Sequence, residues 1–436
     1  MNQFIFLQLN EINFDVTRSY IEKHNDLPAF KQLLIKSKKL ETYSEVLDEQ
    51  QEPWIQWVSA HTGKTYAEHQ IFRLGDIATA AESLNQIFEV LERAGLKVGA
   101  VSPMNARNRL TTPAYFIPDP WTDAVSDGSG FSRRLTKMLR QTVNDNSAGK
   151  LSGTSILTLI ESAFRSFEIK GSFNLLRYIA LAIKNKWYRA LVLDQLLHLV
   201  HLSLWQKHKP DASFVFLNAG AHIQHHYFLN SKVLTAQRKN PSWYAAKEAD
   251  PIHDMLKAYD TILGNYLDLV TQGTQLLVAT GLSQVPFQEA KFFYRLKDHM
   301  GFLSLLGINS TRVMPRMTRD FEIYFDSHVE KERAKALLEG LVMQRDGVAI
   351  FGLVEVREQS IFTTLTYPHE IYGDDKIAGG GVVIHDFGMI VVFVAIKNGT
   401  HCPKGFAYIV TETDVALPAG PVHVAELFNV TKALCL

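Results

Sequence analysis

The feature of this sequence that most constrains its fold is an alternation of short apolar runs with amphipathic helical segments. Phe4–Leu9 is an apolar run that ends in the polar pair Asn10-Glu11, which is typical of a buried parallel strand whose carboxyl end meets a site. Residues 81–94 carry apolar side chains at helical spacing before Gly95, and residues 97–101 return to a strand pattern. This alternation predicts an α/β fold with a doubly wound, mostly parallel sheet.

The same alternation resumes later in the chain. Residues 213–217 and 276–279 have the apolar character of buried strands, and residues 253–270 have the period of an amphipathic helix. We therefore expect a core made of residues 1–126, 211–287 and 380–436. A helical cap insertion at 127–210 and an α+β insertion at 288–379 would interrupt it.

The expected cap contains two Leu-rich helical segments, 174–183 and 190–205, with basic residues between them. One interpretation is a helical bundle that covers the site. The alternative is a peripheral contact with a membrane surface, or with a partner, through residues 174–205, because Lys184, Lys186 and Arg189 accompany Trp187 and Tyr188 there.

The composition excludes some classes of function. Of the 436 residues, 45 are Lys or Arg and 45 are Asp or Glu, so the formal charge of zero gives no general attraction to a nucleic-acid polymer. The two cysteines do not make a disulfide framework. The first residues lack a basic leader, and no apolar run reaches the roughly 18 residues that a membrane span needs. We expect a cytoplasmic protein.

Two segments concentrate histidines at positions where chemistry is expected. His222, His225 and His226 follow the end of the strand predicted at 213–217, and His401 lies in the segment 398–405, Asn-Gly-Thr-His-Cys-Pro-Lys-Gly. Imidazoles grouped in this way favour a metal site or a pair of general acid and base groups. We single out His222 and His226 as candidate catalytic groups, and His225 and His401 as candidate metal ligands.

The order and spacing of these segments, with Thr62-Gly63 after a turn that contains Pro and Trp, resemble the alkaline phosphatase superfamily. The resemblance is to its type I phosphodiesterase/nucleotide pyrophosphatase branch. It implies hydrolysis of phosphate or sulfate esters at two divalent metals beside a hydroxyl or thiol nucleophile. It also implies that His225 and His401 belong to the same metal site.

Several positions depart from the pattern that the resemblance implies. Asn10 stands where a metal-binding Asp is expected, and the neighbouring Glu11 could replace it only if its side chain turned inward. The nucleophile's position falls on Pro53, or on Glu52 after a slip of one residue. Ala221 replaces another Asp.

The second metal site loses its remaining ligands as well. The expected Asp-His pair falls within Thr280-Gly281-Leu282, so both of its ligands are missing. The resemblance therefore implies at most one divalent metal, zinc or manganese.

The remaining candidate residues would bind substrate. They are Glu11, Trp54, Gln56 and His61 near the expected pocket, and Arg316 and Arg319, whose guanidinium groups suit an anionic group. Glu52 and Asn10 complete the catalytic candidates.

Two functions fit these residues. The first is a hydrolase or transferase that acts on a phosphate, phosphodiester or sulfate ester through a non-standard site. The second is a catalytically inactive protein that binds a nucleotide, sugar phosphate or glycan. One form of this second function is a membrane-peripheral protein that takes part in surface-glycan assembly. In either case the ligand is a small anionic molecule or a glycan.

Overall fold

The computed structural model describes residues 3–144, 171–234, 239–316 and 319–436. The chain divides into two units. Unit 1 contains Met1–Thr235, Glu248–Pro286 and Gly399–Leu436, and unit 2 contains Ala236–Lys247 and Phe287–Asn398. The part of the expected cap at 145–170 lies outside the described residues.

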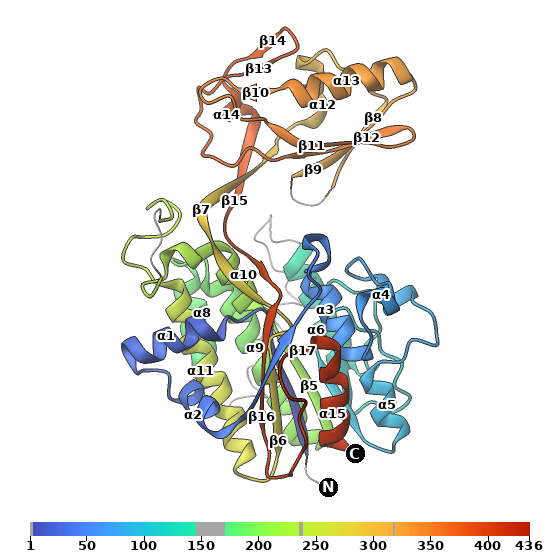
Figure 1. Ribbon diagram of the computed structural model, residues 1–436, viewed down its shortest axis with the longest axis vertical. Coiled ribbons are helices and arrows are strands. Elements are labelled where there is room, and N and C mark those ends of the chain that lie inside the picture. Colours follow the sequence, from blue (N-terminus) through green and yellow to red (C-terminus); the bar gives the residue numbers. More distant parts are fainter. Residues whose placement is uncertain (1–2, 145–170, 235–238, 317–318) are drawn as a thin grey trace. The chain divides into compact units, whose positions relative to one another are not determined.

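Unit 1 is built on an eight-stranded sheet in the order β17-β2-β16-β6-β1-β5-β3-β4 (Figure 1). Strand β16 is antiparallel to both of its neighbours, and the other pairs are parallel. In sheet order the bounds are Val422–His423, Lys38–Tyr43, Lys404–Val410, Gln275–Ala279, Phe4–Leu9, Ala212–Leu217, Val98–Val101 and Tyr115–Ile117. The expected α/β class with a mostly parallel sheet is confirmed.

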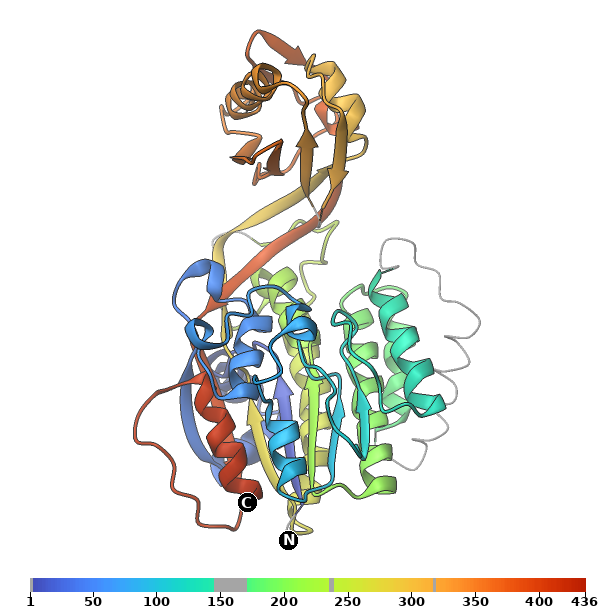
Figure 2. The ribbon, with the colours of Figure 1, turned by 90° about the vertical axis from the view of Figure 1, so that its right-hand side faces the viewer.

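Helices cover both faces of this sheet (Figures 1 and 2). One group contains α3 (Pro53–Thr62), α5 (Ile87–Arg93) and α15 (Leu427–Cys435), which pack on one another. The other contains α2 (Pro28–Lys36), α9 (Tyr188–His208), α10 (Ala219–Tyr227) and α11 (Pro251–Val270). Within the described residues, the other α-helices of unit 1 are α1 (Phe14–His24), α4 (Tyr66–His69), α6 (Gly130–Asn144) and α8 (Phe173–Ala182).

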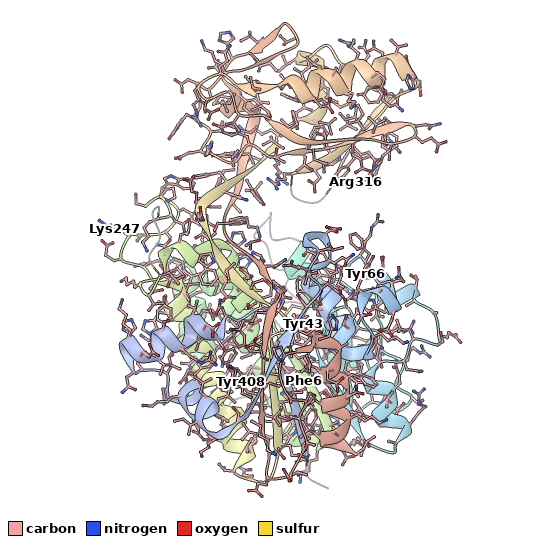
Figure 3. All side chains as sticks on the ribbon, in the orientation of Figure 1. Phe6, Tyr43, Tyr66, Lys247, Arg316 and Tyr408 are labelled. Atoms are coloured by element: carbon pink, nitrogen blue, oxygen red, sulfur yellow. The ribbon has the colours of Figure 1, made fainter. Side chains whose placement is uncertain are left out.

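The core explains why these segments form these elements. Strands β1 and β5 are buried along their whole length, as expected of central strands covered on both faces. Phe6 on β1, labelled in Figure 3, packs against Trp57 and Phe214 in the core. Helix α3, which carries Trp57, begins at Pro53 and ends at Gly63 in the left-handed conformation, two residue types that favour these ends of a helix.

Helix α9 does not lie in the cap position that was expected for residues 190–205. It contacts β5 and β3 and packs beside α10 and α11, so the structure places it in a core layer of unit 1. The physical reason is that its apolar residues surround the helix, and a helix that is apolar on all sides is normally buried. Its buried residues include Leu191, Leu196, Leu199, Val200 and Leu202.

Unit 2 has its own hydrophobic core and is of α+β character. The expected insertion at 288–379 lies inside it. An antiparallel sheet β11-β12-β9-β8 has the bounds Phe351–Val356, Ser360–Leu365, Asp320–Tyr324 and Arg312–Pro315. A second sheet, β10-β13-β14, has the bounds Val342–Met343, Ile377–Gly379 and Val382–Ile384, and the helices are α12 (His299–Leu305), α13 (His328–Gly340) and α14 (Phe387–Ile390).

The chain passes between the units at both ends of Ala236–Lys247, and again within β7 (Ser283–Leu296) and β15 (Val391–Cys402), which pair with each other. The first residues of β7 and the last residues of β15 belong to unit 1. Across the described ranges, no helix has both the length and the apolar character that crossing a bilayer requires.

Candidate metal centre

Three side chains from distant parts of the sequence meet at the carboxyl ends of the central strands. Glu11 follows β1, His225 lies on α10 directly after β5, and His401 lies near the end of β15. Strands β1 and β5 are parallel neighbours, so the residues that follow them reach the same edge of the sheet. All three residues belong to unit 1.

The donor atoms of these side chains form a compact triangle. The Nε2 atoms of His225 and His401 are 3.2 Å apart, and Glu11 Oε2 lies 3.3 Å from the first and 3.4 Å from the second. Among the described residues, this trio is the only group of His, Cys, Asp and Glu with this clustering of potential metal ligands. His225 and His401, which were expected in one metal site, therefore lie side by side, and their binding of a metal remains a prediction.

Glu11 takes part because its backbone turns the side chain inward. Its φ of 60° lies in the left-handed region, which a glutamate rarely adopts. The backbone is held there by a hydrogen bond from Glu11 N to the Thr280 carbonyl at 3.0 Å, and the residue is only 1% exposed. The condition under which Glu11 could replace the missing Asp is thus met in geometry.

The environment keeps the Glu11 carboxyl ionised. Burial alone would raise its pKa, but the charge of His401 and hydrogen bonds with His225 and His401 outweigh burial and hold the pKa well below its usual range. The Asn10 amide, 3.1 Å from Oε1, and the Gln284 amide, which bonds Oε2, also donate to this carboxylate. A buried negative charge faced by two imidazoles is an electrostatic environment that suits a cation.

A second layer of contacts orients these groups. His225 Nδ1 lies 3.2 Å from the Gly399 carbonyl. If Nδ1 carries the proton and donates to that carbonyl, Nε2 is left as a lone pair that faces the cluster, as in known metal sites. Gln224 donates to the Glu11 carbonyl at 2.7 Å and ties α10 to the end of β1.

The residues present fit a zinc-like ion. Zinc bonds to imidazole nitrogen and carboxylate oxygen at about 2.0–2.2 Å, so two tetrahedral ligands lie about 3.3–3.6 Å apart. The three donor separations of 3.2–3.4 Å match this spacing. Two imidazoles and one carboxylate are also a ligand set found in catalytic zinc sites, where a fourth position stays open.

Glu52 lies beside this cluster. It precedes Pro53 as the N-cap residue of α3, its side chain is 32% exposed, and its Oε2 atom lies 3.9 Å from His401 Nδ1. It is therefore a partly solvated carboxylate on the opposite edge of the His401 ring from the donor triangle. Pro53 itself, at the position expected for a nucleophile, offers no hydroxyl or thiol.

The positions expected to hold a second metal are filled by neutral side chains. The Trp57 indole donates to Asn10 Oδ1 at 2.8 Å, and the Asn10 amide donates to Asn218 at 2.8 Å. A Cβ at Gly281 would lie 3.2 Å from the Trp57 ring, so the indole occupies the space next to the missing Asp-His pair. Asn10 acts here as a buried hydrogen-bonding residue.

The other histidines of α10 stand apart from the triangle. His222 is exposed, and its ring centroid is 4.7 Å from that of His226, one helical turn away. Neither belongs to the potential metal ligands. Their assignment as catalytic groups remains a prediction.

The substrate-binding candidates on α3 have partners of their own. Trp54 donates to the Phe72 carbonyl at 3.0 Å, and Gln56 is buried and donates to the Gln50 carbonyl at 2.7 Å. His61 is buried in the core beside Phe88, its Nε2 atom lies 2.8 Å from Gln8, and burial lowers its pKa to about 3. It is therefore a neutral core residue at physiological pH.

Arg316 and Arg319 belong to unit 2, where both are engaged (Figure 3 labels Arg316). Arg316 pairs with Glu322. Arg319 lies over the Phe293 ring, 3.6 Å from its centroid, and donates to the Leu365 carbonyl. These contacts are structural, and a role in substrate binding remains a prediction.

Some residues of the site were not predicted. Gln284 holds Glu11 and donates to the Ala221 carbonyl at 3.0 Å, while Trp57 and Asn218 complete the network around Asn10. The one available signal was position, because Asn218 directly follows the strand predicted at 213–217. Gln284 comes five residues after the strand predicted at 276–279, so its position gives a weaker signal. Residue type alone does not distinguish these amides from other polar loop residues.

Comparisons with known proteins give a similarity of fold only. No protein-family model matches the chain, and neither does any curated protein. Among solved structures, phosphonoacetate hydrolase from Sinorhizobium meliloti in complex with phosphonoformate is 12% identical, with coverage of 100% of this chain and 96% of that chain and a TM-score of 0.44.

Two further solved structures are similar to the same extent. Murine ectonucleotide pyrophosphatase/phosphodiesterase 5 is 10% identical, with coverage of 99% and 95% and a TM-score of 0.41. Wild-type alkaline phosphatase PafA is 10% identical, with coverage of 99% and 95% and a TM-score of 0.44. At this level the similarities assign no activity, so function has to be inferred from the residues of the site.

Proposed function

We propose that unit 1 is a hydrolase or transferase of a phosphate, phosphodiester or sulfate ester that uses one divalent metal ion. Glu11, His225 and His401 would hold the ion, with zinc favoured over manganese because two of the three ligands are imidazoles. The observation that supports this proposal is the donor triangle with sides of 3.2–3.4 Å.

The chemistry of this proposal differs from a two-metal mechanism. When bound, a zinc ion supplies Lewis acidity toward an ester oxygen and lowers the pKa of a bound water. Because Pro53 offers no nucleophilic atom, we propose that water attacks the ester directly. Glu52, partly solvated and beside His401, is the proposed general base that accepts a proton from that water.

The neutral residues around Asn10 fit an anionic substrate. Asn10, Trp57 and Asn218 bond to one another without a net charge, so one carboxylate, Glu11, supplies the negative charge of the donor triangle. A single divalent cation gives the donor triangle itself a net positive charge, which attracts a small anion such as a sugar phosphate, while the Glu52 carboxylate lies on the other edge of the His401 ring. A charged glycan is a second ligand class within this proposal, and a nucleic-acid polymer is not expected because the formal charge of the chain is zero.

A second function is favoured by two specific observations. The position of the nucleophile is occupied by Pro53, and Trp57 fills the space beside the lost ligands. This is also the pattern expected of a protein that binds an anionic ligand without turnover.

A cytoplasmic location and a peripheral membrane contact through residues 174–205 are further parts of the proposal.

Chromogenic esters distinguish the two functions. Zinc-loaded protein is assayed with p-nitrophenyl phosphate, bis(p-nitrophenyl) phosphate and p-nitrophenyl sulfate. We expect hydrolysis of at least one ester, loss of that activity in His225→Ala and His401→Ala, and a strong decrease in kcat in Glu52→Gln with zinc retained. His328→Ala, at an exposed position of unit 2, is the matched control and should be fully active.

One result would contradict the proposed site, and another would contradict the enzymatic function. Full activity in His225→Ala or His401→Ala would place the reaction elsewhere in the chain. Absence of turnover with every ester, in protein that binds zinc and an anionic ligand, would favour the inactive binding protein.

A further inference from the structure

Helix α8 is apolar on two sides, and one of them packs on other described parts of unit 1. Leu175 and Tyr178 are buried, and α8 packs on α9. Leu176, Ile179 and Ile183 are 62%, 42% and 81% exposed. Because Leu176, Ala180 and Ile183 recur at intervals of four and three residues, they form one outward stripe along the helix.

Basic side chains border this stripe. Arg177 and Lys184 each follow a stripe residue by one position and are seven residues apart, so they lie along the same edge of the helix. Lys186 and Arg189 are exposed in the turn and the first residues of α9. Residues 171–193 contain these four Lys and Arg residues and no Asp or Glu.

The small size of this surface argues against a stable protein interface. The helix has 10 residues, and a helix of that length extends for about 15 Å. A stable protein complex buries about 800 Å² on each partner, which is more than one face of such a helix offers. A bilayer needs no shape complementarity, because apolar side chains enter the acyl boundary and basic side chains remain among the headgroups.

We propose that unit 1 binds peripherally to anionic lipid bilayers through the outward face of α8. Leu176, Ile179 and Ile183 would insert into the interface, and Arg177, Lys184, Lys186 and Arg189 would contact acidic headgroups. The proposal narrows the membrane contact expected within 174–205 to this helix and the turn after it, because α9 is largely buried in the core. It does not depend on the ester chemistry.

Vesicle co-sedimentation of the full chain tests this proposal. The probes are vesicles of pure phosphatidylcholine and of equal parts phosphatidylcholine and phosphatidylserine. We expect sedimentation with the acidic vesicles, weakening as salt is added. The variant Leu176→Ser/Ile183→Ser should weaken this binding by about tenfold or more, and Arg177→Gln/Lys184→Gln should remove the preference for the acidic vesicles.

A matched control comes from another exposed apolar residue. Ile35 on α2 is 73% exposed, so Ile35→Ser should bind vesicles like the unchanged protein. Circular dichroism verifies that each variant is folded. Absence of sedimentation with acidic vesicles at low salt, or equal sedimentation of the α8 variants, would overturn the proposal. So would a dimer in solution that Leu176→Ser/Ile183→Ser dissociates, since the face would then bind a second copy.

Discussion

Glu11 shows how much of the site depends on the conformation of one residue. The left-handed conformation of a non-glycine residue costs about 1–2 kcal/mol and is found most often where the surroundings impose it. Here Thr280 and Gln224 bond to the backbone of Glu11, and Gln284 bonds to its carboxylate. This conformational cost is consistent with a functional need for the Glu11 side chain to point toward His225 and His401.

A substitution at Gly399 tests this arrangement without removing any of the three potential metal ligands. A Cβ at this position would meet Gln284 Oε1 at 2.6 Å and the Gln224 carbonyl at 3.1 Å, both in the layer that holds Glu11. We expect Gly399→Ala to displace Gln284 and to weaken zinc binding by about tenfold or more, as loss of outer-shell contacts usually does. Titration with a competing zinc chelator measures this affinity.

The control for this prediction is Gly373→Ala. A Cβ at Gly373 would have no neighbour within 4 Å. Its zinc affinity should equal that of the unchanged protein. Equal affinity in Gly399→Ala would show that the layer around Gln284 does not control the site.

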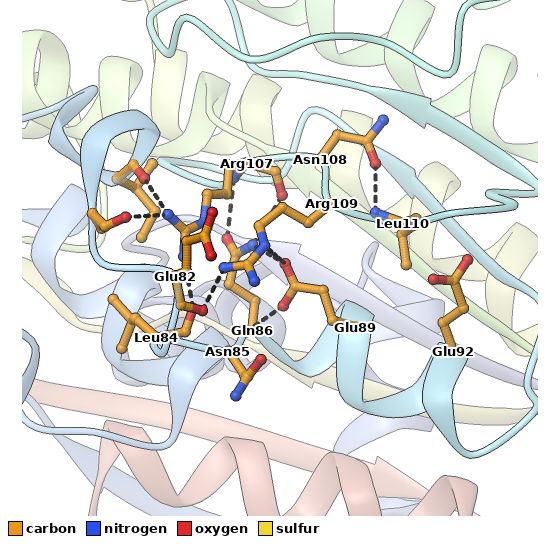
Figure 4. A network of polar contacts seen from close by, with 12 residues as sticks. Glu82, Leu84, Asn85, Gln86, Glu89, Glu92, Arg107, Asn108, Arg109 and Leu110 are labelled. Atoms are coloured by element: carbon orange, nitrogen blue, oxygen red, sulfur yellow. Dashed lines mark hydrogen bonds and ion pairs between the residues drawn. The ribbon is translucent and has the colours of Figure 1, made fainter.

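Among the secondary-structure elements, buried polar groups hold the loops and helices that surround the sheet. Arg107 follows β3, and its guanidinium donates to the carbonyls of Ala80, Ala81 and Leu84 at 2.6–2.9 Å (Figure 4). It thereby ties the segment before α5 to the sheet. These bonds use the two terminal nitrogens of the guanidinium, whereas its buried Nε atom has no hydrogen-bond partner among the described residues.

Replacement of Arg107 should therefore destabilise unit 1. Arg107→Met leaves these carbonyls without their donor, and each unsatisfied buried group costs about 1–3 kcal/mol. We expect the free energy of unfolding to fall by about 3 kcal/mol in urea denaturation. Arg109→Met is the matched control. Arg109 is exposed, donates to one carbonyl, that of Glu82, and has a long ion pair of 4.0 Å with Glu89, so the effect of its replacement should be much smaller. Equal effects of the two variants would contradict this interpretation.

Helix α9 is attached to the sheet by a buried histidine. His201 Nε2 lies 2.7 Å from the Ser213 hydroxyl on β5, and Nδ1 lies 2.9 Å from the Tyr266 hydroxyl on α11. Burial, with a smaller contribution from neighbouring His198, lowers the pKa of His201 from 6.5 to about 3. A histidine with a lowered pKa stabilises the fold above pH 6.5, and this stabilisation is lost as the pH falls toward 3.

His201→Asn measures that loss. Near pH 7.5 we expect the variant to be less stable than the unchanged protein by about 1–3 kcal/mol, because a buried hydrogen bond is lost. Below pH 6.5 the difference should shrink by about 1.4 kcal/mol per pH unit, since only the unchanged protein has to protonate this buried ring. Urea denaturation at several pH values checks both statements. A difference independent of pH would contradict them. His328→Asn, at an exposed position of unit 2, is the control and should be as stable as the unchanged protein near pH 7.5.

At the scale of the whole molecule, the central fold could be predicted because its signals are local. Phe4–Leu9 and Ala212–Leu217 are buried on both faces, and such strands are continuous apolar runs in any sequence. Helix α9 was expected in a cap, although its all-round apolar character indicates a buried helix.

The site could be predicted only in part, because its remaining features arise from contacts between distant segments. His225 and His401 carry a type of side chain that marks metal sites, so the sequence indicates them. The inward turn of Glu11 depends on Thr280, more than 250 residues away, and the position of Trp57 depends on Asn10 and Gly281. No local pattern encodes these contacts.

Metal content is the first measurement to make, by elemental analysis of protein purified without a chelator or a metal-affinity tag. The geometry predicts about one equivalent of zinc in the unchanged protein, and a large loss in His225→Ala and in Glu11→Gln, the second of which removes only the charge of the carboxylate. Absence of metal after incubation with zinc or manganese, or a full equivalent in both variants, would contradict a metal site at Glu11, His225 and His401.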